Sequence, residues 1–186
     1  MIEIFASIIL AAGSAETKVP PPEWSKVAAA ARSYQREASD ENAARLYRLV
    51  PTRELSISER PDDSTRRLLY SLVPDLERRM FYGDLWSTRL AFRLLNAADA
   101  AFSEDLGAAL GSLATNRPEL FLRELELEGG SCYLITMFNP DYDERWIKSE
   151  RRLPIARLRE TAPTSLEPRR RECLRLLLSD HDAEAR

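Results

Sequence analysis

Proline and glycine interrupt this chain at short intervals, and their spacing limits the fold more than any other feature. Between the breaks, leucine, alanine and aromatic residues recur every three or four positions, which is the pattern of a helix with one buried face. The pieces predict about seven or eight helices of roughly 10 to 16 residues, joined by short connections. We therefore expect an all-α fold, with room for one short strand or hairpin.

Individual residues indicate where the first helices begin and end. A helix is expected over residues 23–38, which contain an alanine run of high helix propensity. Asp40 is a suitable N-cap for a second helix, and Pro51 ends it. Beyond it, Leu55 and Ile57 alternate with polar neighbours, which is the pattern of a short strand.

The middle of the chain carries clearer boundaries. Residues 62–64 are expected to start a helix that Pro74 kinks or splits. After a break at Gly83, Ser103 and Asn116 are the expected N-caps of two later helices.

The order of these elements indicates how they pack. Residues 85–127 alternate helix, short turn and helix in units of about 20 residues, which suits antiparallel pairs stacked as in a HEAT-like superhelix. An irregular helical bundle is the alternative. Residues 132–138 are apolar without a helical period and fit either a strand or a short buried helix. A helix interrupted by Pro154 and a last helix capped by Ser165 complete the chain.

The N-terminus has the pattern of an export signal. Residues 1–15 are mostly apolar and end in small side chains, so we expect a signal peptide cleaved after Ala15. The segment has no Lys or Arg and carries Glu3, so a buried N-terminal helix or strand is the alternative. Residues 16–22 would be a proline-rich linker. The expected helical domain then covers residues 23–179, followed by a flexible tail over 180–186.

Charge and cysteine content fit a protein outside the cytoplasm. The net charge of −3 gives no reason to expect nucleic-acid binding, and no integral membrane span is expected. In an oxidising compartment, Cys132 and Cys173 would form a disulfide; two buried free thiols are the alternative. We therefore expect a periplasmic or secreted location.

No set of residues predicts a catalytic, cofactor or metal site. His181 lies in a polar tail, away from any partner expected of a catalytic histidine. Residues 139–150 resemble a calcium loop only in part, because Glu144 stands where the loop needs glycine. Glu124, Glu126 and Glu128 are expected to face solvent. The arginine clusters at 151–152 and 169–171 lie among acids and are expected to pair locally.

Three functional hypotheses follow. The first is an exported helical module that binds a protein or peptide, without cofactor. The second is a periplasmic hydrolase using carboxylates such as Asp141, Asp143 or Glu144, and it requires acids with split pKa values in a pocket. The third is an inhibitor or immunity-type protein that blocks a secreted enzyme.

Overall fold

The computed structural model describes residues 21–53, 55–133, 153–161 and 165–183. Its labelled elements are α1 (Trp24–Arg36), α2 (Asp40–Leu49), η1 (Ile57–Glu59), α3 (Asp63–Tyr70), α4 (Val73–Phe81), α5 (Leu85–Leu94), η2 (Leu95–Ala97), α6 (Ala100–Asn116), α7 (Pro118–Glu128) and α9 (Glu167–Ala183). Residues 153–160 form a further helical segment. No strand occurs in the described ranges, so the predicted all-α class is confirmed.

Short polar side chains cap the N-termini of four of the described helices. Ser39, Asp62, Asp84 and Asp99 each accept a hydrogen bond from a backbone N–H in the first turn of α2, α3, α5 and α6. The expected caps at Asp40 and Ser103 were therefore wrong, because a suitable oxygen lies one and four residues earlier. The cap expected at Asn116 was also wrong, since α6 includes that residue.

The structure also tests the predicted break at Pro74 and the predicted strand around Ile57. Pro74 does split its helix: α3 ends at Tyr70 and α4 begins at Val73, with the proline in the first turn, where its missing N–H costs nothing. The strand suggested around Ile57 is instead the 3₁₀ turn η1, which a capping box between Ser56 and Glu59 closes.

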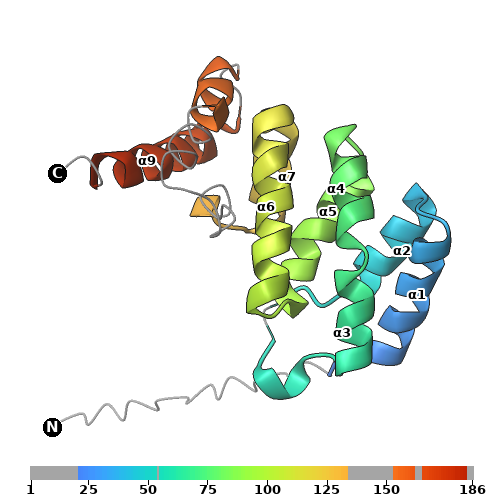
Figure 1. Cartoon of the computed structure of the whole chain (residues 1–186). Helices are drawn as coiled ribbons and strands as arrows, with labels where there is room; N and C mark the ends of the chain where they lie inside the picture. The colour runs from blue at the N-terminus through green and yellow to red at the C-terminus, as the bar shows by residue number, and fades with distance from the viewer. Residues whose placement is uncertain (1–20, 54, 134–152, 162–164, 184–186) are drawn as a thin grey trace, which may run out of the picture.

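The helices pack as stacked pairs. α1 packs on α2, α4 on α5 and α6 on α7, while α2, α5 and α7 pack successively as one layer. α1 contacts α3, and α4 contacts α6, in the other layer. Figure 1 shows the elements following one another across the molecule from α1 to α9. Within residues 85–127, where stacked antiparallel pairs were expected, α6 and α7 form such a pair.

One continuous apolar core joins these pairs. Its largest fully buried side chains include Tyr34, Phe102 and Phe121, and most of the others are leucines. Leu158 and Leu177 extend the same core into the C-terminal part, which Cys132 and Cys173 join to the end of α7 by a disulfide. α9 continues to Ala183, beyond residue 179, where the helical domain was expected to end. The expected leader and residues 16–20 of the expected linker lie outside the described residues.

Candidate functional site

The connections within the helix pairs lie next to one another. We call residues 37–39 turn 1, residues 82–84 turn 2 and Arg117 turn 3, because they join α1 to α2, α4 to α5 and α6 to α7. One arginine links each successive pair of turns. Arg79 links turns 1 and 2, which we call the first junction, and Arg117 links turns 2 and 3, which we call the second junction.

At the first junction, Arg79 has polar partners on every side. Its Nη2 donates to Asp40 Oδ1 at 2.5 Å and to Asp84 Oδ2 at 2.6 Å. Its Nη1 donates to the carbonyl of Ala38, and its Nε donates to Ser87 Oγ at 3.1 Å. Ser87 is fully buried, and its hydroxyl also lies 3.2 Å from the hydroxyl of Tyr34. The guanidinium of this α4 residue therefore contacts turn 1, α2, turn 2 and α5, and Ser87 extends the network to Tyr34 of α1.

The two carboxyls at this junction have opposite pKa shifts. A hydrogen bond with Asp84, together with its charge, raises the pKa of Asp40. Partial burial acts to raise the pKa of Asp84, but hydrogen bonds from Ser87, Asp40 and Arg79 outweigh it and hold that pKa below its ordinary value. Split pKa values can indicate an acid–base pair. Here both carboxylates bind the same guanidinium nitrogen, so we interpret the group as a structural clamp beside a cavity of about 530 Å³.

At the second junction, Arg117 has few partners. Its Nε donates to the carbonyl of Phe81 at 3.4 Å, and the guanidinium lies over Gly83, whose added Cβ would be 3.8 Å from Nε. Gly83 has φ +86°, a conformation that favours glycine in this turn. Within the described ranges Arg117 forms no ion pair. It occupies the N-cap position of α7, and its side chain makes no cap hydrogen bond.

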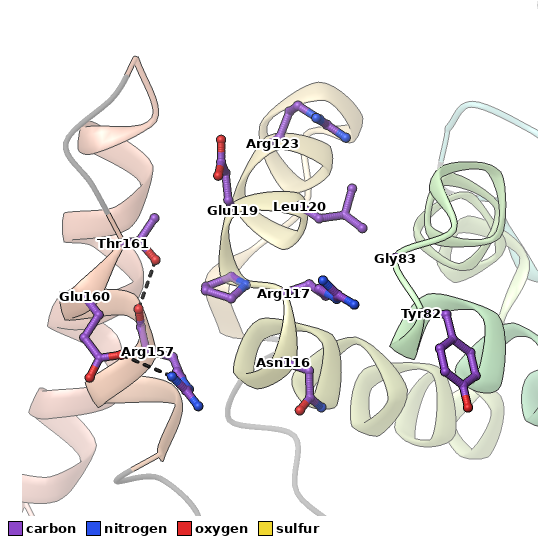
Figure 2. Close-up of a pocket in the computed structure, with 11 residues that line it drawn as sticks. Tyr82, Gly83, Asn116, Arg117, Glu119, Leu120, Arg123, Arg157, Glu160 and Thr161 are labelled. Carbon is purple, nitrogen blue, oxygen red and sulfur yellow. Dashed lines mark hydrogen bonds and ion pairs between the residues drawn. The ribbon is translucent and has the colours of Figure 1, made fainter.

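A groove of about 760 Å³ opens around Arg117, and we call it the Arg117 groove (Figure 2). Its lining residues come from turn 2, from the α6–α7 connection, from α7 and from the C-terminal part. They are Tyr82, Gly83, Asn116, Arg117, Pro118, Glu119, Leu120, Arg123, Arg157, Glu160 and Thr161. Arg157 pairs with Glu160 at 3.2 Å. In Figure 2, Arg117 and Arg123 extend toward the side of Tyr82, whereas Glu119 points away from it.

An exposed aromatic pair consists of Tyr82, which lines the groove, and its neighbour Phe81. Phe81 is 53% exposed and Tyr82 is 75% exposed, and their rings meet edge to face at 5.4 Å. Met80, the preceding residue, is buried in the core. The chain thus exposes two large rings to solvent where α4 passes into turn 2.

The glutamates of α7 differ from the sequence-based expectation. Glu124 is fully buried, and its two oxygens accept from Arg89 and Arg123 at 2.8 and 2.9 Å. Glu128 is mostly buried and pairs with Arg93. The expectation that this row faces solvent was wrong for both, because arginines on α5 lie opposite the same face. Only Glu126 is largely exposed, and it pairs with Arg169 of α9.

The remaining expected sites have simple outcomes. Cys132 and Cys173 are disulfide-bonded, with Cα atoms 4.9 Å apart. The cluster at 169–171 pairs locally, largely with Glu167 and Glu172. Residues 139–150, including Asp141, Asp143 and Glu144, and also 151–152 and the side chain of His181, lie outside what the structure describes. No group of three or more His, Cys, Asp or Glu able to hold a metal occurs in the described part.

Sequence reasoning missed both junctions. A sign of the second one was available, because arginine stands at the N-cap position before Pro118, where an oxygen-bearing side chain is the usual choice. The Phe81–Tyr82 pair directly after the last buried position of α4 was a second sign. Comparison of the chain with protein-family models, curated proteins and solved structures finds no match. None of the described helices is long and apolar enough to cross a bilayer.

Proposed function

We propose that this chain is an exported helical module that binds a protein or peptide at the Arg117 groove. The observation that carries the proposal is the exposed Phe81–Tyr82 pair beside Arg117 at an open groove. Aromatic residues and arginine are enriched where proteins bind one another, because aromatic rings bury much area at a low entropy cost and arginine forms charge-assisted hydrogen bonds. The packing of the described core does not explain why these two rings are exposed to solvent.

Two features support export. A disulfide persists in oxidising compartments and is rare in the cytosol. The apolar residues 1–15 fit a secretory leader by composition. Intact mass of the protein recovered from its native host tests this point. We expect a chain that begins at Glu16 and lacks the two hydrogens lost on disulfide formation; a full-length mass with free thiols would contradict export.

The hydrolase hypothesis has less support. Its named acids lie outside the described residues, and the described pair with split pKa values already binds Arg79. An inhibitor or immunity-type role is a special case of partner binding. It would apply if the partner is a secreted enzyme whose activity falls on binding.

Crosslinking in the native host tests partner binding. Tagged wild type, a Phe81→Ala/Tyr82→Ala variant and an Ile57→Ala control would be crosslinked and compared by mass spectrometry. Ile57 is a matched control because it is 86% exposed but lies on η1, outside the groove. We expect one protein to be enriched with wild type and the control and lost with the double variant. Equal enrichment with all three chains would overturn the proposal.

A further inference from the structure

The two junctions of the helix stack suggest what kind of partner the groove takes. Given the proposed function, on which this inference rests, we propose that the partner supplies an acidic peptide segment. Its carboxylates would bind Arg117 at the second junction as Asp40 and Asp84 bind Arg79 at the first. The chain thus provides its own acids at one junction, and a partner provides them at the other.

The geometry of the two arginines supports this assignment. Each reaches back to a carbonyl of the preceding turn region, Arg79 to Ala38 and Arg117 to Phe81. Arg79 then binds two carboxylates. Arg117 binds none among the described residues, although guanidinium groups form their strongest pairs with carboxylates. Asp84 is the N-cap of α5, whereas Arg117 itself occupies the N-cap position of α7.

The charges around Arg117 favour an acidic ligand. Glu124 is shared between Arg89 and Arg123, so one carboxylate faces two guanidinium groups and a positive charge remains in excess. On the side of the groove toward Tyr82, Figure 2 shows Arg117, Arg123 and Leu120, with no labelled acid. Glu119 points away, so it does not neutralise this side.

The size and rim of the groove favour a peptide over a small anion. A phosphate ion would contact guanidinium groups and leave the rings of Phe81 and Tyr82 exposed to water. An extended segment could place a carboxylate at Arg117 and an apolar side chain against Tyr82 in the same binding mode. The open groove of about 760 Å³ has room for several residues.

Titration with a defined probe tests the inference. The probe is a peptide of alternating glutamate and alanine, about eight residues and roughly 27 Å when extended. The neutral control peptide carries glutamine in place of glutamate. Binding to the disulfide-intact full chain would be followed by fluorescence anisotropy, and the Arg Nε–H signals by NMR. We expect the acidic peptide to bind, to shift the Arg117 signal and to bind less tightly at high salt.

Matched variants locate the binding. Arg117→Gln should lower the affinity for the acidic peptide about tenfold. Arg171→Gln removes the same charge from an exposed arginine outside the groove and should leave the affinity unchanged. Asn116→Asp places a carboxylate in the groove without removing any arginine, so it should also weaken binding. Circular dichroism would check that each variant is folded.

Several outcomes would overturn the inference. Equal binding of the acidic and neutral peptides would exclude charge recognition, and equal losses in Arg117→Gln and Arg171→Gln would show non-specific attraction. Displacement of the peptide by millimolar phosphate, with no dependence on Tyr82, would identify a small-anion site instead. The crosslinked partner separates the two proposals: if it still depends on Phe81 and Tyr82 while no acidic peptide binds, partner binding stands and only the acidic chemistry fails.

Discussion

Arg79 and Arg117 link successive turns of one helix stack, but their surroundings differ. Arg79 is enclosed by two carboxylates, a carbonyl and a buried hydroxyl. Among the residues that the structure describes, Arg117 has one carbonyl as a hydrogen-bond partner, and it lies in an open groove. A guanidinium with all its partners in the same chain contributes to stability. One with an incomplete set contributes little, and it remains available to a ligand without breaking any internal contact.

The C-terminal part forms one side of the Arg117 groove, and this distinguishes the second junction from the first. Arg157, Glu160 and Thr161 belong to the C-terminal part, which the disulfide ties to the end of α7. Among the described residues, the partners of Arg79 at the first junction come from turn 1, α2, turn 2 and α5. The two junctions should therefore respond differently when the C-terminal part is loosened.

The largest expected effect comes from removing the disulfide between Cys132 and Cys173. A Cys132→Ser/Cys173→Ser variant opens a loop with a sequence separation of 41 residues. The loop-entropy model predicts a loss of about 4 kcal/mol in the free energy of unfolding. Urea unfolding with and without a reductant measures it, and the variant should no longer respond to the reductant. Hydrogen exchange should rise more over residues 153–178 than in α1–α5. A uniform rise would contradict the difference between the junctions.

Truncating the two arginines compares the junctions directly. Arg79→Ala leaves Asp84 and the buried Ser87 without their partly buried arginine partner, so we expect a loss of about 3 kcal/mol in unfolding free energy. Arg117→Ala removes one long hydrogen bond at an exposed position and should change stability by less than about 0.5 kcal/mol. Chemical denaturation of both variants provides the measurement. Equal losses would show that Arg117 is as structural as Arg79.

The pH dependence of stability should differ between the junctions. Asp84 has a lowered pKa in the folded protein, so its contribution is present above its unfolded value near 3.8 and is lost as pH falls below it. Asp40, with a raised pKa, acts in the opposite direction and partly offsets this loss. Asp84→Asn should therefore flatten the decline in unfolding free energy below pH 4. Arg117→Gln should leave the shape of that curve unchanged. The check is urea unfolding from pH 2.5 to 6.

Much of the helical architecture could be predicted from the sequence because it depends on local patterns. The split at Pro74 and the break at Gly83 follow from the backbone of those residues. The N-caps of α2 and α6 were wrongly predicted at Asp40 and Ser103, because several oxygen-bearing residues stand near each helix start and only the geometry selects one.

The candidate site was not predictable in the same way. Arg79 binds residues 41 and 39 positions earlier, Ala38 and Asp40, and no local pattern records such a pairing. The burial of Glu124 depends on Arg89 from another helix pair. What the sequence does carry is the apolar pair at 81–82 and the arginine before Pro118, and neither indicates a groove until α4, α6 and α7 are placed together.

The smallest expected effect concerns an ion pair that, like the disulfide, joins the C-terminal part to α7. Arg169 of α9 pairs with Glu126 of α7 at 2.8 Å, at an exposed position. A double-mutant cycle of Arg169→Gln and Glu126→Gln should give a coupling energy of about 0.5 kcal/mol, because water and salt screen such pairs. The same cycle in the Cys132→Ser/Cys173→Ser background sharpens the comparison. If the disulfide positions the C-terminal part, the coupling should fall toward zero once it is removed, since the two side chains no longer have a fixed separation. An unchanged coupling would mean that the buried Leu158 and Leu177 hold the C-terminal part without the disulfide. In that case neither the first nor the second junction would depend on the Cys132–Cys173 disulfide for its structure.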